Sequence, residues 1–199
     1  MTLSALTRHG TPPARVDRES LGLLLRVLDE HDPGIIEDLN RVGHLARDTA
    51  QAMGLPEDEV ERIELAGRLH DVGKLAIPDT ILQKRGPLDA AEWVTMRTHT
   101  LIGARIVAAA PSLAPIESLI RSNHEHYDGT GYPDRIAGDA VPLGAYIVGT
   151  AAAFVAMMKH RPYSDAITVE AALGELRRCS GSQFHPAVVE AFTRVFEGV

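Results

Sequence analysis

The sequence contains little cysteine, few aromatic residues and no excess of basic charge, and each shortage excludes a class of protein. Its single cysteine, Cys179, excludes an internal disulfide and a zinc ribbon, and predicts a reducing, cytoplasmic setting. Aromatic residues make up 5% of the 199, so a core must be mostly aliphatic. Lys and Arg number 20 against 27 Asp and Glu, which argues against binding to nucleic-acid polymers or anionic membranes.

Strand-like alternation and long apolar runs are also missing. A helix without charged residues is expected over 143–158, but it is shorter than the roughly 20 residues that a bilayer requires. We therefore predict a buried helix and no membrane insertion. The N-terminus lacks an apolar segment flanked by basic residues, so no secretory signal is expected. Elsewhere apolar residues recur every three or four positions, which predicts an all-α fold.

Two parts of the chain differ in pattern. Residues 1–18 include Gly10, Pro12 and Pro13 without periodicity, and are predicted to be a flexible tail or the remnant of a linker. Residues 19–199 are predicted to form a single helical domain. Its helices are expected near 19–31, 35–53, 56–70, 89–101, 116–124, 143–158, 168–178 and 185–196.

The stretch from Leu69 to Asp79, LHDVGKLAIPD, carries the strongest chemical signal. His70 falls on the inner face of its helix, and Asp71 follows directly, so an imidazole and a carboxylate can reach one divalent metal ion. A lone inward histidine is more often a hydrogen-bonded core residue. Gly73, which breaks the helix, and Lys74, which can reach an anion, favour a functional site instead.

The segment after Asp89 adds a second candidate ligand. Asp89 and Glu92 have the spacing of a capping box, which begins a helix. Trp93 and Met96 are expected in the buried stripe of that helix. His99 falls close to this stripe, so it is expected to point inward as well.

The stretch SNHEHYDGTGYPD supplies a third candidate. His124 lies one turn beyond Ile120 on the inner face of a helix, whereas His126 would point away. Glycines around Tyr132 permit close approach to a ligand, and the tyrosine offers a ring face and a hydroxyl. A plain turn is an equally good interpretation of this loop taken alone.

Several separated motifs together resemble one family. These are LHDVGKLAIPD, the helix of His99, NHEHYDGTGYPDRIAGDAVPL, the triplet RPY at 161–163, and GSQFHPAVVEAF at 181–192. In this order they resemble an HD-GYP domain, the branch of the HD phosphohydrolases that opens cyclic di-GMP. The resemblance covers roughly 19–199. It implies an HD-type helical bundle with a C-terminal helical extension, and a site of two or three metals, usually iron or manganese.

The resemblance also implies roles for individual residues. It assigns metal binding to His70, Asp71, His99 and His124, with Asp71 and Lys74 in the catalytic centre. Lys74 matches a lysine that contacts the substrate phosphate, Arg161 could make a similar contact, and Tyr132 matches the tyrosine of the Gly-Tyr-Pro signature.

Five positions depart from the family pattern. Gly34 stands where a glutamate that binds a third metal can occur. Asp38 stands where a histidine ligand is expected, and Asn123 replaces one of two paired histidines. Ala152 and Val155 replace two aspartates on the buried helix. An aspartate can still coordinate a metal, whereas an alanine cannot. We therefore expect at most one well-held iron or manganese ion. His126, His160 and His185 could be proposed as replacements, but are better explained as surface histidines.

Two main hypotheses follow from this ligand set. The first is a degenerate HD-GYP domain that binds cyclic di-GMP or a related nucleotide, or a signalling protein through the Gly131-Tyr132-Pro133 loop. The second is an active phosphodiesterase that uses Asp38 in an altered metal site. A purely structural helical module is a third, less favoured reading.

Overall fold

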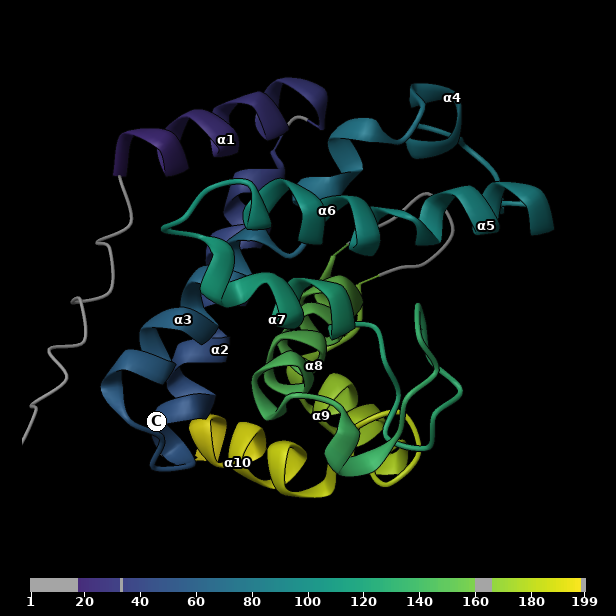
Figure 1. The fold of residues 1–199 in the computed structure, drawn as a ribbon. Helices are drawn as coiled ribbons and strands as arrows, with labels where there is room; N and C mark the ends of the chain where they lie inside the picture. Colours follow the sequence, from purple (N-terminus) through teal and green to yellow (C-terminus); the bar gives the residue numbers. More distant parts are fainter. Residues whose placement is uncertain (1–17, 33, 160–165, 198–199) are drawn as a thin grey trace, which may run out of the picture.

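Helix-forming periodicity runs through nearly all of the chain, and the computed structural model is accordingly helical (Figure 1). It describes residues 18–32, 34–159 and 166–197. Ten α-helices and three short 3₁₀ helices occur in these ranges: α1 Arg18–His31, α2 Ile35–Ala52, α3 Glu57–Leu69, η1 Val72–Ala76, α4 Asp79–Leu82, α5 Ala90–Arg97, α6 His99–Ala108, η2 Ala114–Ile116, α7 Glu117–Ser122, η3 Gly138–Ala140, α8 Leu143–Met158, α9 Val169–Arg178 and α10 Pro186–Glu197. The all-α prediction is confirmed.

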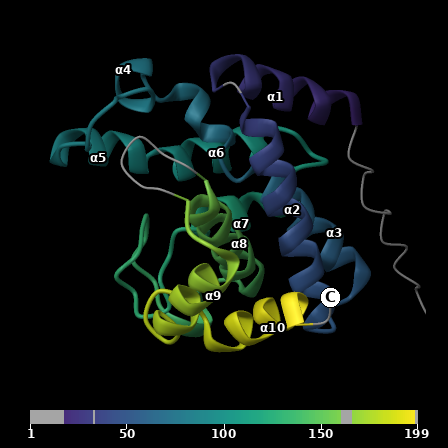
Figure 2. The same ribbon diagram turned by 180° about the vertical axis from the view of Figure 1, so that it is seen from behind.

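The uncharged helix α8 lies in the centre of the molecule. Figures 1 and 2 show α2, α3, α7, α9 and α10 around it. Phe154 of α8 is fully buried, and its ring centroid lies 5.2 Å from that of Phe192 in α10. The prediction of a buried helix over 143–158 is therefore confirmed. Among the described residues, no helix is long and apolar enough to cross a membrane.

A close backbone contact joins η1 to α6. A Cβ atom on Gly73 would lie 1.9 Å from the main-chain oxygen of His99 and 2.6 Å from the nitrogen of Gly103. Only a residue without a side chain allows the two segments to approach this closely. Gly73 thereby holds the turn that carries Asp71 against the beginning of the helix that carries His99.

The capping box at Asp89 is confirmed, because the Asp89 and Glu92 side chains each accept a hydrogen bond from the other's backbone N–H. The expected burial of Trp93 is wrong: this residue is 46% exposed. The helix that begins here ends at Arg97, and a new helix begins at His99. The short α5 contacts α4 and α6, and none of its residues is buried.

Some predictions fall outside the described residues. The flexible tail was predicted over 1–18. Residues 1–17 of it lie outside the described ranges, and Arg18 is the first residue of α1. His160 and the RPY triplet, including Arg161, lie outside them as well.

We expect Gly73→Ala to lower the free energy of unfolding by about 1–3 kcal/mol, because the new methyl group overpacks the contact with α6. Urea denaturation measures the effect. Gly174→Ala is the matched control, since a Cβ there meets nothing within 4 Å and the position is helical. It should raise stability by up to about 1 kcal/mol. Equal stability of Gly73→Ala and the unaltered chain would contradict a rigid contact at this position.

Candidate metal centre

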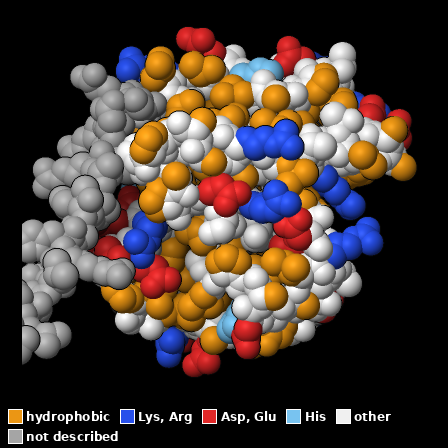
Figure 3. Space-filling model, in the orientation of Figure 1, with side chains coloured by type: hydrophobic (Ala, Val, Ile, Leu, Met, Phe, Trp, Pro, Cys, Tyr) orange, Lys and Arg blue, Asp and Glu red, His pale blue; other side chains and the backbone are white. Residues whose placement is uncertain are grey.

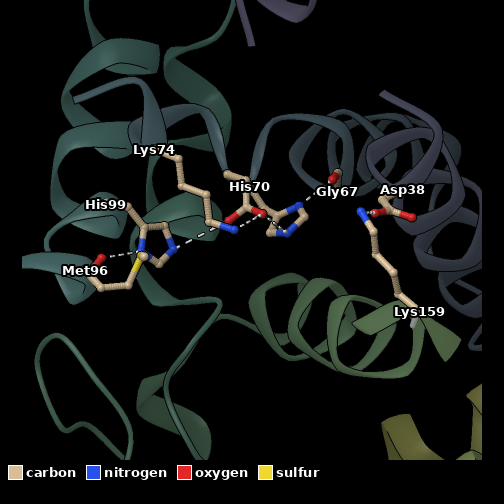
Figure 4. Close-up of polar contacts among 8 residues, drawn as sticks. Asp38, Gly67, His70, Lys74, Met96, His99 and Lys159 are labelled. Carbon is tan, nitrogen blue, oxygen red and sulfur yellow. Dashed lines mark hydrogen bonds and ion pairs between the residues drawn. The ribbon is translucent and has the colours of Figure 1, made fainter. Parts of the chain in front are cut away.

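The carboxylate of Asp71 lies at the centre of the candidate site. Its Oδ2 atom is 2.7 Å from Lys74 Nζ and 3.3 Å from His70 Nε2, and its Oδ1 atom is 3.7 Å from His99 Nε2. Figure 4 shows the side chains of Lys74, His70 and His99 pointing toward one another. Asp71 itself is only 9% exposed, so its charge is compensated by these neighbours and little by water.

The backbone orients two of these imidazoles. His70 Nδ1 lies 2.8 Å from the carbonyl oxygen of Gly67, and His99 Nδ1 lies 2.8 Å from that of Met96. A neutral imidazole that donates its Nδ1 proton to a carbonyl keeps Nε2 as an acceptor or metal ligand. The buried His99 Nε2 atom has no hydrogen-bond partner among the described residues.

One group of side chains within the described ranges meets the geometry of a metal centre. It consists of Asp71, His99 and His124, whose ligand atoms all lie within 4.8 Å of one another. These residues come from the turn after α3, the first position of α6 and the segment after α7. One carboxylate and two imidazoles are ligands that suit a divalent transition metal, so the residues fit one such ion.

Burial governs the protonation of the site. Burial raises the pKa of Asp71, but the charges of His70 and Lys74 outweigh it and hold this pKa well below its ordinary value. Burial lowers the pKa of His99, and burial together with the charge of His99 lowers that of His124 much further. The site at neutral pH therefore contains an ionised carboxylate and two neutral imidazoles, the protonation states that metal binding requires.

The Gly131-Tyr132-Pro133 loop lies against this centre. The Tyr132 ring is stacked on the ring of His124, with 4.8 Å between centroids. A Cβ atom on Gly131 would lie 2.2 Å from the nitrogen of His126, so the loop folds back tightly here. Glu125 stabilises the loop, because its Oε1 atom accepts hydrogen bonds from the backbone N–H groups of residues 134 and 135.

Burial also raises the pKa of Tyr132, and the charge of Asp71 adds to this effect. Its hydroxyl is therefore protonated at neutral pH and can donate a hydrogen bond to an anion.

The structure does not bring Asp38 into this group. Asp38 Oδ2 accepts an ion-pair hydrogen bond of 2.5 Å from Lys159 Nζ, at the end of α8. Figure 4 shows Asp38 and Lys159 on the far side of His70 from His99. Ala152 is a partly buried residue of α8, and Asn123 is 4% exposed with an amide that has no partner among the described residues.

Two of the three alternative histidines can be placed. His126 is half-buried, and its Nδ1 atom lies 2.9 Å from Thr130 Oγ1. His185 is also half-buried, with its ring centroid 5.0 Å from Tyr127 and 5.4 Å from Tyr146. His126 and His185 are thus both partly exposed, and neither belongs to the group of Asp71, His99 and His124.

Two residues near the centre were missed from the sequence. Glu125 organises the loop, and Arg97 lies over the Tyr132 ring. Glu125 stands between two histidines, a position that indicates nothing about its backbone partners. Arg97 lies in α5 and Tyr132 in the loop after α7, so helical periodicity could not relate the two.

The fold and the site together define a helical protein with a centre of histidines and an aspartate suited to a divalent metal. An HD domain family model matches residues 22–188. The chain therefore belongs to the HD domain family, and its resemblance to the HD-GYP phosphodiesterases is confirmed by its relatives.

One relative is the cyclic di-GMP phosphodiesterase response regulator RpfG of Xanthomonas campestris pv. campestris (strain 8004). It is 41% identical over 180 residues, which are 89% of this chain and 48% of RpfG. A cyclic di-GMP phosphodiesterase of Thermotoga maritima is 38% identical over 175 residues, 86% of this chain and 48% of the relative. The chain thus spans about half the length of these relatives.

A crystal structure of a cyclic GMP-AMP specific phosphodiesterase from V. cholerae, V-cGAP3, shares the fold. It superposes with a TM-score of 0.67 over 90% of this chain and 48% of that one. At 23% identity, this likeness concerns the fold alone.

We expect the metal-free protein to lose stability as the pH falls from 7 to 5. In this range the unfolded chain protonates its histidines near pH 6.5, whereas folded His99 and His124, with lowered pKa values, stay neutral. The unfolded state then binds more protons, so acid favours it, by at most about 1.4 kcal/mol per pH unit for each histidine. Asp71 does not contribute here, because its stabilisation is lost only below its ordinary pKa of 3.8.

Urea denaturation in the presence of a chelator at both pH values measures this loss. The double variant His99→Gln/His124→Gln should show a flatter dependence on pH. The control His126→Gln, which lies outside the three-ligand group, should match the unaltered chain. The same slope in the double variant and the unaltered chain would show that other groups cause the loss.

Proposed function

We propose that this chain is a degenerate HD-GYP domain that binds a cyclic dinucleotide, holds at most one divalent ion and hydrolyses phosphodiesters poorly. The observation that carries the proposal is the composition of the centre. Asp71, His99 and His124 form one group of ligands, whereas Asp38 is paired with Lys159. A two-metal centre needs further donors, and Ala152 has none to offer.

Each residue of the centre has a definite task in this proposal. A divalent ion bound there supplies Lewis-acid polarisation of a phosphoryl oxygen. Lys74 is hydrogen-bonded to Asp71 but its side chain remains 25% exposed, so its ammonium can also contact a phosphate. The protonated hydroxyl of Tyr132 donates to the same anion. Arg161 is proposed as a further phosphate contact on the basis of the resemblance alone.

Contacts of the Tyr132 ring favour a nucleotide over a protein partner for the Gly131-Tyr132-Pro133 loop. The ring is stacked on His124 and lies beneath the Arg97 guanidinium. The ring is therefore engaged by these two residues, and less of it is available to a docking protein. On the side of the molecule shown in Figure 3, Lys and Arg are interspersed with Asp and Glu, so a small ligand suits the surface better than a polyanion.

An active phosphodiesterase is the second candidate. The observation that favours it is the 41% identity to RpfG, which is named a cyclic di-GMP phosphodiesterase, together with the intact group of Asp71, His99 and His124. The two candidates differ in the rate that they predict and in the number of metal ions.

Metal content and cyclic di-GMP turnover, measured after anaerobic purification, distinguish these candidates. We expect the unaltered chain to hold at most one iron or manganese ion and to hydrolyse cyclic di-GMP far more slowly than about 1 s⁻¹, the low end of ordinary enzyme rates. Asn123→His/Ala152→Asp should gain a second ion and measurable turnover. Ala153→Asp, which adds the same carboxylate one position along α8, is the control and should gain neither.

Hydrolysis of cyclic di-GMP by the unaltered chain at ordinary enzyme rates would overturn the hypothesis of a degenerate domain and favour the active enzyme. A complete lack of metal would contradict the active enzyme and leave the degenerate domain.

We also expect Asp71→Asn to abolish metal binding, because the amide removes the only carboxylate of the three-ligand group. Elemental analysis measures the loss, and circular dichroism checks that the helices remain. An unchanged metal content would show that the ion is held elsewhere.

A further inference from the structure

Two exposed side chains near the candidate metal centre have no role in the proposed binding of the metal. Trp93 and Arg97 lie one helical turn apart on α5, and both are exposed, Trp93 to 46%. Trp93 is the only tryptophan of the chain. A single exposed aromatic residue is ordinary on a protein surface, so the arrangement of its neighbours has to decide whether it has a role.

Arg97 connects α5 to the loop of the centre. Its Cζ atom lies 5.2 Å from the centroid of the Tyr132 ring, over the ring, and 5.9 Å from that of Trp93. Both distances are within the range of a cation–π contact. Because Tyr132 is itself stacked on His124, the guanidinium is only one ring removed from a candidate metal ligand.

The charge of Arg97 is not matched by an acid. In the ranges 18–32, 34–159 and 166–197, no carboxylate forms an ion pair with it, whereas Lys74, Lys84 and Arg121 are each paired with one. Contacts through the face of a guanidinium leave the N–H donors at its edge available. Arg97 therefore presents a positioned positive charge with free donors next to the centre.

We propose that Arg97 binds the second phosphate of a cyclic dinucleotide whose first phosphate lies at the group of Asp71, His99 and His124. This inference rests on the proposed function and extends it from the reacting phosphate to the recognition of the whole ligand. The planar fork of an arginine matches two phosphate oxygens. The exposed Trp93 ring beside it offers a surface on which a nucleobase stacks.

The proposal distinguishes two classes of ligand. A dinucleotide has two phosphates and can engage the metal centre and Arg97 together. A cyclic mononucleotide has one phosphate and can engage only one of them. Loss of the arginine charge should therefore weaken the dinucleotide selectively.

Calorimetric titration of the whole chain with cyclic di-GMP and with cyclic GMP tests this selectivity. We expect Arg97→Gln to weaken binding of cyclic di-GMP about 10-fold or more, the effect of losing a charged hydrogen bond, and to leave cyclic GMP unchanged. Arg105→Gln is the charge-matched control, since Arg105 is exposed in the last turn of α6, and both ligands should bind it as they bind the unaltered chain. Arg97→Lys should restore part of the affinity.

Tryptophan fluorescence adds a readout of position, because Trp93 is the only source of the signal. Cyclic di-GMP should quench it in the unaltered chain, and the midpoint in Arg97→Gln should shift to higher concentration by the same factor as in calorimetry. Thermal melting followed by circular dichroism confirms that Arg97→Gln is folded.

Three outcomes would overturn the inference, and they separate it from the proposed function. If Arg97→Gln binds cyclic di-GMP as the unaltered chain does, the second-phosphate site is wrong while the proposed function stands. If both ligands weaken equally, Arg97 acts through Tyr132 and not on a second phosphate. If the unaltered chain binds no cyclic di-GMP, the proposed function fails and the subsite fails with it.

Discussion

Burial of the Asp71 carboxylate is the constraint on which the rest of the site depends. A buried carboxylate without compensation costs roughly several kcal/mol, and here Lys74 at 2.7 Å and His70 at 3.3 Å supply the compensation. His99 adds a third polar neighbour from another helix. Lys74 and His70 belong to the same segment as Asp71, so the turn after α3 carries most of its own charge compensation. The contact with His99 is the electrostatic link between this turn and α6.

Two backbone contacts support the centre independently of its ligands. Gly73 brings η1 against α6, and Gly149 brings α8 against the end of α7. A Cβ atom on Gly149 would lie 2.3 Å from the main-chain oxygen of Asn123. Both contacts involve main-chain atoms, so they do not require particular ligand side chains. This explains how the group of Asp71, His99 and His124 persists beside Asn123 and Ala152: the scaffold is determined by close packing of the backbone, and the loss of a ligand leaves that packing intact.

Local features of this fold could be predicted from the sequence, whereas features that depend on distant segments could not. The buried helix over 143–158 and the capping box at Asp89 arise from residues close together in the chain, and both are confirmed. The burial of Trp93 was predicted wrongly because periodicity shows which residues share a face and not whether another element covers it. The pair of Asp38 and Lys159 joins residues 121 positions apart, so no local pattern could reveal it.

Charge balance gives a physical reason to expect one ion and not two. The three-ligand group contains a single carboxylate, and the two imidazoles are neutral because burial lowers their pKa values. One divalent ion already exceeds the charge of Asp71, and Lys74 adds a further positive charge beside it. A second divalent ion would meet a net positive field at short range, where repulsion is weakly screened. The carboxylate of Asp38 could reduce that field, but it is neutralised by Lys159, and Ala152 brings no carboxylate from α8. The proposed limit of one ion therefore has an electrostatic reason as well as the missing donors.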